Sequence, residues 1–441
     1  MIDLKYILKR CITLELWAIA IFIIFAIVMI ITITEKIDKT SATILGAILT
    51  YLILSLEGTT LDEVINFIDF PTIMTMFGVL VAGTIVNDSG LFQWAAIKLV
   101  KLTKGEPVKL FVLLTLLVIL LSSILTIFVA AIIISRVTIS ITRALDIDSK
   151  PFLLASSVAV SIGGVTSLIA SPASILIAES AHLNLIFFII YTMPIGLITG
   201  GLFIFVLQRK LNLPKDIPEI RKSVLMEFDE WSVVPDKKLF YMSAVLLFGM
   251  IAGFLLLPEP HLVAFTGGVL FLIVRKSEFD EVAHELEWSD IFFFIGIFII
   301  VGGIEHTGIL IEIGNLLGSV SRGNPLLPLM IVVWFVGLTS GFLDAIVLAL
   351  LFIPIINELV IVGGFQNYFY IFIISLILSA NIGGCLTPIG TPANLIILSR
   401  GQKEGANISA KEFLKYGVVA VILGLIIESI YVMIIYFYFA F

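Results

Sequence analysis

The chain has 441 residues, of which 60% are hydrophobic and only 13% are charged, and its formal net charge is -7. This composition excludes an ordinary water-soluble globular protein, and no basic stripe suggests nucleic acid as a partner. Apolar runs long enough to cross the hydrocarbon core as helices recur from end to end. The sequence therefore predicts an all-α polytopic membrane protein in the lipid bilayer, with about 10–12 membrane segments.

The first half is expected to contain four clear spans and one long apolar block. In chain order, the spans lie at 16–33, 43–56, 71–86 and 185–207, and the block lies at 110–144. A short acidic amphipathic stretch precedes the third span, and a surface segment ending in lysines precedes the block. The block is broken near Ser122 and Ser123. This break fits either the tip of a re-entrant hairpin or a turn between two full crossings.

The second half of the chain reads as another copy of the first. The triplet Asp-Glu-Val at 62–64 recurs at 280–282, which is an offset of 218 residues. SIGGVTSLIASPAS at 161–174 recurs as NIGGCLTPIGTPAN at 381–394. Such a match over more than a hundred residues indicates an internal duplication. It predicts a first repeat, a linker loop and a second repeat at 1–208, 209–237 and 238–441.

Each predicted repeat crosses the membrane an odd number of times, so the two repeats must have inverted topologies. Most lysines and arginines fall on one side when the central loop is placed in the cytoplasm, as the positive-inside rule requires. We therefore expect a multi-pass protein of the cell membrane whose central loop, 209–238, is cytoplasmic. The N-terminal Lys5, Lys9 and Arg10 fall on the other side.

The two Gly/Pro stretches interrupt apolar segments at equivalent places in the repeats. Gly383, Gly384 and Gly390 allow close backbone approach, and Pro388 and Pro392 prevent a continuous helix. Unpaired backbone groups in hydrocarbon are costly and are kept only where protein or a water-filled cavity surrounds them. Paired breaks in inverted repeats are therefore typical of a transporter binding site near the bilayer midplane. The alternative is that small and hydroxyl residues merely let helices pack closely.

At these residues the chain resembles the ArsB/NhaD-type permeases of the ion transporter superfamily, which are related to the citrate and dicarboxylate:sodium symporters. The likeness is strongest in NIGGCLTPIGTPANLIIL from Asn381 and in SGFLDAIVLALLFIPII from Ser340, and it covers essentially the whole chain. It implies two inverted-topology repeats. Each repeat would have a re-entrant hairpin and a broken transmembrane helix, and their tips would meet at the substrate.

The resemblance places the site in four segments of this chain. The hairpin tips would be Ser122–Thr126 and Ser340–Asp344, and the broken-helix loops would be Gly163–Ser174 and Gly383–Asn394. The residues expected to bind substrate or ion are Ser122, Ser123, Thr126, Gly163, Gly164, Thr166, Ser167, Ser171, Ser174, Ser340, Asp344, Asn381, Gly383, Gly384, Thr387, Thr391 and Asn394.

Departures from the family pattern bear on ion coupling. Members often carry an Asp-Asn pair at each hairpin tip, whereas this chain has Thr126 followed by isoleucine and Asp344 followed by alanine. Ser161 stands where asparagine is usual, and SPAS replaces a pattern closer to Asp-Pro-Pro-Asn. The first repeat has thus lost carboxylate and amide ligands. Ion coupling would then depend on the second repeat, with Na+ bound near Asp344 and Asn394, or on protons in place of Na+.

Ionisable residues within apolar segments are costly and are candidates for transport roles. We expect Asp344 to carry the coupling proton or to help bind a cation, unless it only caps a hairpin helix. Arg136 either attracts an anionic substrate or extends to the nearby cytoplasmic face. Glu179 and Glu428 either act in transport or pair with a neighbouring helix.

Three further side chains carry simpler expectations. Glu305 and His306 end a span and are expected to cap it or to face water. Cys385 is a candidate thiolate ligand for arsenite, or else a small buried hydrophobic residue. Cys11 is the other cysteine of the chain, and two cysteines imply no disulfide framework.

Together these features predict a secondary active transporter rather than an enzyme. It would move a small inorganic or organic anion, or an oxyacid such as arsenite, by alternating access, driven by a proton or sodium gradient and without a cofactor. The alternative is a Na+/H+ antiporter of the NhaD type, followed by a passive channel or an intramembrane enzyme. HELEW from His284 lacks the second histidine of a zinc-protease motif. No phosphate-binding loop occurs in the sequence, so any ATP hydrolysis would require a separate soluble ATPase subunit as a partner. A homodimer is the other partner considered.

Overall fold

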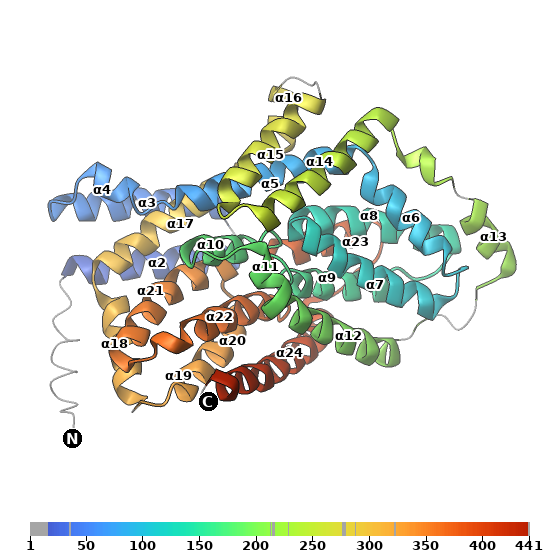
Figure 1. The fold of residues 1–441 in the computed structure, drawn as a ribbon. Helices are drawn as coiled ribbons and strands as arrows, with labels where there is room; N and C mark the ends of the chain where they lie inside the picture. The colour runs from blue at the N-terminus through green and yellow to red at the C-terminus, as the bar shows by residue number, and fades with distance from the viewer. Residues whose placement is uncertain are drawn as a thin grey trace. The chain divides into compact units, whose positions relative to one another are not determined.

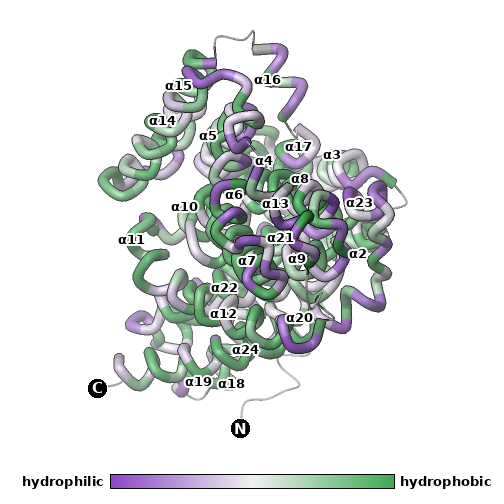
Figure 2. The backbone as a smooth tube through the Cα atoms, turned by 90° about the vertical axis from the view of Figure 1, so that its right-hand side faces the viewer, coloured by the Kyte–Doolittle hydropathy of each residue, from purple (hydrophilic) through white to green (hydrophobic). Residues whose placement is uncertain are grey.

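The computed structural model describes residues 16–34, 37–211, 213, 217–227, 229–275, 279–286, 288–321 and 323–439. Within these ranges every regular element is a helix, and eleven helices are long and apolar enough to cross a membrane. The expected class and number of segments are confirmed. Figure 2 shows hydrophobic residues along helices such as α14, while α16 is hydrophilic. Lys5, Lys9, Arg10 and Cys11 lie outside the described residues.

The first half and the central loop contain the following helices (Figure 1). In chain order they are α2 (Leu16–Thr34), α3 (Lys39–Leu56), α4 (Leu61–Ile65), α5 (Phe70–Asp88), α6 (Leu91–Lys101), α7 (Pro107–Ile124), α8 (Ile127–Leu145), α9 (Lys150–Gly163), α10 (Pro172–Ser180), α11 (Leu185–Phe187), the π-helix η1 (Phe188–Thr192), α12 (Met193–Lys210), α13 (Glu219–Glu227) and the 3-10 helix η2 (Glu230–Val233).

The second half follows the same plan. Its helices are α14 (Lys237–Leu256), α15 (Pro260–Arg275), α16 (Phe279–Glu285), α17 (Trp288–His306), α18 (Ile309–Val320), α19 (Leu326–Ile331), the π-helix η3 (Val332–Val336), α20 (Gly337–Thr339), α21 (Ala345–Gly363), the 3-10 helix η4 (Gln366–Tyr368), α22 (Phe369–Gly383), α23 (Pro392–Lys403) and α24 (Ala410–Phe439).

Helix bounds repeat between the halves at the offset seen in the sequence. Helix α17 begins and ends 218 residues after α5, and α21 does so after α8. Before α6 and α18, Gly90 and Gly308 both adopt left-handed backbone, with φ of 74° and 77°. Glycine takes this conformation without steric cost. The duplication is therefore visible in the secondary structure as well as in the residues.

The described chain forms two compact units, and each takes segments from both halves. The first comprises Met1–Phe70, Glu287–Gly323 and Leu350–Gly364, and the second comprises Pro71–Leu286, Asn324–Ala349 and Phe365–Phe441. The compact units are thus not the two repeats. The repeat boundaries drawn from the sequence stay a prediction.

In the first unit, α3 packs against α2 and α17 (Figure 1). Gly296 on α17 meets the backbone of α3, because a Cβ built on it would lie 3.1 Å from the carbonyl oxygen of Thr43. Lys39 and Asp290 form an ion pair of 2.7 Å at one end of this contact. The buried core of the unit is made by Ile21, Leu54, Val64, Ile304, Leu310 and Ile355.

The second unit contains the reciprocal contact. Gly78 lies on α5 at the position equivalent to Gly296, and a Cβ built on it would lie 2.1 Å from the carbonyl oxygen of Ala264 on α15. Helix α15 is the counterpart of α3. The third span of each half therefore packs on the second span of the other half. Such reciprocity is expected of two inverted copies of one fold.

Candidate functional site

Both predicted broken helices are present, and both breaks lie in the second unit. Helix α9 ends at Gly163, and α10 begins after an eight-residue loop. Ser171 is the N-cap of α10, and its hydroxyl accepts a 3.1 Å hydrogen bond from the Ser174 backbone N–H. Pro172 follows at the first helical position, where its missing N–H costs nothing.

The second break is built in the same way. Helix α22 ends at Gly383, and Thr391 caps α23 by accepting a 3.4 Å hydrogen bond from the Asn394 backbone N–H. Pro392 again occupies the first turn. Gly390 is needed here, because a Cβ on it would lie 2.6 Å from the Gly384 carbonyl oxygen. The local chemistry of glycine, proline and a hydroxyl cap thus produces both interruptions.

Side chains from the arm after each break satisfy the exposed carbonyls of the loop. The Ser174 hydroxyl donates to the Gly164 carbonyl at 3.2 Å. Asn394, its counterpart, donates through Nδ2 to the carbonyls of Gly384 and Thr387 at 3.0 and 3.1 Å. These bonds supply the hydrogen-bond partners that a loop within hydrocarbon requires.

The two broken helices also bind each other. Helix α9 packs against α23, and α10 packs against α22. Asn381 Nδ2 donates to the Ser174 hydroxyl at 3.1 Å, and the Ser157 hydroxyl donates to Asn394 Oδ1 at 3.4 Å. Ser157 is not among the site residues predicted from the sequence. Its signal was a hydroxyl four residues before Ser161 on an otherwise apolar helix face.

The two hairpin tips lie against the first arms of the broken helices. A Cβ built on Gly163 would lie 1.7 Å from the Ser122 hydroxyl oxygen. A Cβ built on Gly383 would lie 2.7 Å from Ser340 Cβ, and the Ser340 hydroxyl donates to the Ala380 carbonyl. Each tip therefore lies at the depth of a helix break. This position favours re-entrant tips over turns at the far membrane face.

Polar contacts join each tip to the adjacent loop. The hydroxyls of Ser123 and Thr166 are hydrogen-bonded to each other in the first half. In the second half the Thr387 hydroxyl donates to the Gly341 carbonyl. The backbone N–H of Ile127 donates to the Ala170 carbonyl at 2.9 Å. Hairpins and loops are thus held as one assembly.

A small cavity of about 20 Å³ lies where the four segments meet. Four of the predicted residues line it, namely Ser171, Asp344, Asn381 and Thr391, together with Ser161. This space holds about one water molecule. The other predicted residues do not line this cavity, and several of them hold the tips and loops around it.

Four helices begin at this cavity. Its wall includes the first residues of α8, α10, α21 and α23, represented by Ile127, Pro172, Ala345 and Pro392. A helix N-terminus carries about half a positive charge and exposes unpaired N–H groups. The convergence of four such ends makes the cavity attractive to anions, although no lysine or arginine lines it.

Asp344 caps a helix and also lines the cavity. Its Oδ1 accepts a 3.1 Å hydrogen bond from the Ile346 backbone N–H at the start of α21, and the half-buried residue also lines the cavity. At the equivalent place, the Thr126 hydroxyl accepts a 3.4 Å hydrogen bond from the Val129 N–H. Only the second repeat thus places a carboxylate there.

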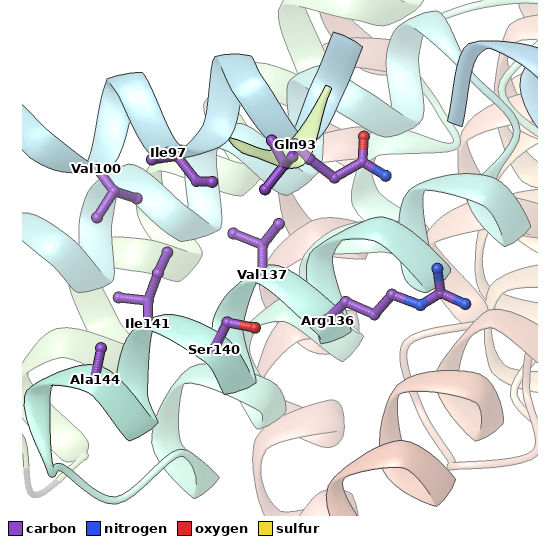
Figure 3. A pocket seen from close by; sticks show the side chains of 9 residues that line it. Gln93, Ile97, Val100, Arg136, Val137, Ser140, Ile141 and Ala144 are labelled. Carbon is purple, nitrogen blue, oxygen red and sulfur yellow. The ribbon is translucent and has the colours of Figure 1, made fainter. Parts of the chain in front are cut away.

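Arg136 does not line this cavity. It lies at the edge of a separate cavity of about 240 Å³ between α6 and α8. Figure 3 shows Ile97 facing Val137 and Ile141 across that cavity, while the Arg136 side chain extends away from them. Arg136 is exposed, which favours the second alternative, that its side chain extends to the nearby membrane face.

The remaining candidates have distinct surroundings. Glu305 and His306 are exposed at the end of α17, and Glu428 is fully buried within α24. Glu179 has partners on neighbouring helices, Thr75 and His261. Cys385 is fully buried, and its Sγ donates to the Val158 carbonyl at 3.4 Å. Among the described residues, no group of three or more His, Cys, Asp or Glu side chains could hold a metal ion.

Several known proteins resemble this chain in sequence. A "46 kDa membrane protein" of Mycobacterium leprae is 26% identical over 414 residues, covering 92% of this chain and 96% of the relative. An "uncharacterized transporter" of Mycobacterium tuberculosis is 27% identical over 422 residues, with 94% and 97% covered. The P protein of Sus scrofa is 22% identical over 495 residues, but this match covers only 59% of its length.

A solved structure supports the fold. The YdaH transporter of Alcanivorax borkumensis superimposes with a TM-score of 0.57 over 87% of this chain and 88% of that chain, at 14% identity. The CitMHS family model, described as "Citrate transporter", matches residues 27–372 and 319–441. The chain therefore belongs to the CitMHS family and is a multi-pass membrane transporter.

Proposed function

We propose that the protein is a secondary active transporter for a small carboxylate anion, of which citrate is the first candidate. The observation that carries the proposal is the convergence of four helix N-termini on one cavity. The positive ends of the four helix dipoles would attract the carboxylate groups of a substrate, although side-chain caps already accept one N–H at each of these ends. A small anion with several carboxylates suits such a site, and the family description names citrate.

The small size of the cavity supports a mechanism of alternating access. A space of about 20 Å³ holds a water molecule but not a tricarboxylate, so the site must open to admit its substrate. Tips and loops from both repeats form its wall. Relative movement of these elements would expose the site first to one side of the membrane and then to the other.

The position of Asp344 in the cavity wall supports coupling of transport to a cation or a proton. A carboxylate and an anionic substrate in one cavity repel each other unless a cation or a proton neutralises the carboxylate. Asp344 is the one ionisable side chain among the residues that line the cavity. A proton, or Na+ held near Asp344 and Asn394, would therefore enter with the substrate. The proposed orientation keeps the central loop in the cytoplasm.

Other substrates of the superfamily are less well supported by this site. The Cys385 thiol points to the Val158 carbonyl and is fully buried, so it offers arsenite no thiolate in the cavity. A Na+/H+ antiporter of the NhaD type would not need a cavity surrounded by helix N-termini. The resemblance to ArsB/NhaD permeases thus extends here to the shared superfamily architecture.

Uptake into proteoliposomes tests the proposal. Labelled citrate, succinate, phosphate and arsenite are offered under imposed proton or sodium gradients, with empty liposomes as the control. We expect saturable uptake of a carboxylate above its equilibrium level, and its loss when the ion gradient is collapsed. Gradient-driven Na+/H+ exchange without anion uptake would instead establish the antiporter. Anion flux that never exceeds equilibrium would establish a channel.

A further inference from the structure

A second polar cluster lies at the far end of α10, away from the cavity. The Thr75 hydroxyl donates to Glu179 Oε1 at 3.0 Å, and His261 Nδ1 lies 3.2 Å from Glu179 Oε2. The side chains of Glu179 and His261 are only 9% and 21% exposed. Three helices thus meet at this point, since Thr75 lies on α5, Glu179 on α10 and His261 on α15.

We infer that Glu179 and His261 form a proton-binding site used in the transport cycle, in addition to the charge that neutralises Asp344. This inference rests on the proposed function as a secondary transporter. Histidine ordinarily changes its charge between about pH 5 and 8, within the range of physiological proton gradients. A proton on the pair yields an ion pair, whereas its removal leaves a nearly buried carboxylate with neutral partners.

Protons can reach the pair from solvent. His261 Nε2 lies 3.7 Å from a carboxylate oxygen of Glu259, whose side chain is 58% exposed. The other titratable group close in sequence is His182, which is exposed just after α10. Asp88 and Arg275, which are 3.0 Å apart, lie at the opposite ends of α5 and α15. Glu259 is therefore the entry group for a proton bound by His261.

The pair lies on the membrane face opposite to the central loop. The span that ends in α12 begins at Leu185, five residues after α10, and reaches the central loop at Lys210. Helix α14 leaves that loop and ends at Leu256, just before α15. Both paths place the pair away from the central loop. With the central loop in the cytoplasm, the pair takes its proton from outside.

Helix α10 connects this pair to the substrate cavity. Its N-cap, Ser171, and its first residue, Pro172, line the cavity, while Glu179 lies in its last turn. Eight residues of helix separate Ser171 from Glu179, which is about 12 Å. A change in the charge of the pair alters how α10 is held against α5 and α15. The helix transmits that change to its N-terminus at the cavity.

The duplication contains no second copy of this pair. The residue 220 positions after Glu179 is Ser399, and the residue 218 positions before His261 is Thr43. Neither titrates in the physiological range. The pair itself joins the two predicted repeats, because Glu179 lies in the first and His261 lies in the second.

Substitutions separate this proton site from the rest of the transporter. The variants are Glu179→Gln and His261→Gln, and the matched control is His182→Gln, which removes an exposed histidine outside the pair. Under an imposed gradient of one pH unit, we expect the ratio of internal to external citrate to fall about tenfold in both variants, because one coupled proton contributes a factor of ten to that ratio. Citrate exchange without a gradient should stay within about twofold, and the control should resemble the wild type.

A titration checks the proton directly and needs no transport. The chain has four histidines, so NMR of imidazole-labelled protein in nanodiscs allows the His261 signal to be assigned from its loss in His261→Gln. We expect the His261 signal to change with pH in the wild type and to respond differently to pH in Glu179→Gln.

The outcomes are distinguishable. Identical pH dependence of uptake in the wild type and both variants would overturn this inference and leave the proposed function standing. A His261 signal that is constant between pH 5 and 9 would do the same. Absence of any gradient-driven uptake in the wild type would overturn the proposed function, and the coupling role with it.

Discussion

The side-chain amide of Asn381 donates a hydrogen bond of 3.1 Å to the Ser174 hydroxyl, which lies 207 residues earlier in the chain. Both residues are buried, and each belongs to a different broken helix. Ser174 in turn donates to the Gly164 carbonyl in the first loop. One chain of hydrogen bonds thus runs from the second repeat into the interrupted backbone of the first.

Replacement of Asn381 by alanine should break this connection. The change removes one of the two hydrogen bonds that the Ser174 hydroxyl accepts, since the Ser171 hydroxyl still donates to it at 3.0 Å, and a lost hydrogen bond costs about 0.5–1.5 kcal/mol. We expect a lower melting temperature and at least a tenfold loss of uptake, because the loop would no longer be held at the cavity. Ser157→Ala is the matched control, since its 3.4 Å bond to Asn394 Oδ1 is longer and should matter less. Equal effects of the two substitutions would contradict this ranking.

Alanine at Gly78 or Gly296 should destabilise the fold by a steric mechanism. The added methyl would lie 2.1 Å from the Ala264 carbonyl oxygen at Gly78, and 2.7 Å from Thr43 Cγ2 at Gly296. Overpacking of this kind typically costs about 1–3 kcal/mol. We expect reduced melting temperatures by fluorescence-detected unfolding in detergent, with the larger loss at Gly78, where the obstacle is backbone.

Gly249 provides the control for these two substitutions. It also lies within a spanning helix, but a Cβ built on it meets nothing within 4 Å. Gly249→Ala should therefore be neutral or stabilise by up to about 1 kcal/mol, since alanine is the better helix former. A similar destabilisation in all three variants would show that close packing is not the cause.

Asp344→Asn should uncouple transport without unfolding the protein. Asparagine keeps the side-chain oxygen that accepts the Ile346 N–H, so the cap of α21 is preserved. It cannot be protonated or carry a negative charge. We expect uptake to lose its dependence on the imposed proton or sodium gradient, while the melting temperature changes little. Asp236→Asn is the control, because Asp236 caps α14 in the same way outside the cavity.

Glu285 should contribute stability that depends on pH. Hydrogen bonds from Arg275, at 3.1 and 3.4 Å, hold the pKa of Glu285 below its ordinary value of 4.5. A lowered pKa stabilises the folded state above the ordinary value, and this contribution is lost as pH falls through the lowered one. Glu285→Gln should therefore lower the melting temperature at pH 7 but not near pH 3. The effect is at most about 1 kcal/mol, since the pair is partly exposed and screened.

The comparison for Glu285 is Glu227→Gln, an exposed glutamate on the central loop. Its melting temperature should follow the wild type at both pH values. A difference between Glu285→Gln and the wild type that persists at low pH would show that packing, not charge, is responsible.

The sequence predicted those parts of the site that local chemistry determines. Gly383, Pro392 and Thr391 specify a helix end, a restart and a cap through their own backbone and side-chain preferences, and the breaks occur there. The same holds for Ser171 and Pro172 in the first repeat. Duplication strengthened the prediction, since a chance break would not recur at the same offset.

Contacts that depend on how helices face each other could not be predicted. Nothing local indicates that Ser157 reaches Asn394, or that the Cys385 thiol donates to the Val158 carbonyl, because both depend on the rotation of one helix against another. The sequence also left undecided whether the turn at Ser122 is a re-entrant tip. Only its contact with Gly163 shows that this turn lies beside the helix break. The π-helix at Phe188–Thr192 also has no signature in the apolar pattern.

The reciprocal helix contacts at Gly78 and Gly296 set the order in which the helices can pack during synthesis. When the ribosome has inserted α5, the partner of its glycine surface, α15, has not yet been synthesised. Helix α3 likewise lacks its partner α17 until the second half of the chain has been synthesised. The contact surfaces of α5 and α3 therefore stay uncovered until the second copy emerges, and a truncated product that ends at the central loop would expose both surfaces to lipid and to quality-control proteases.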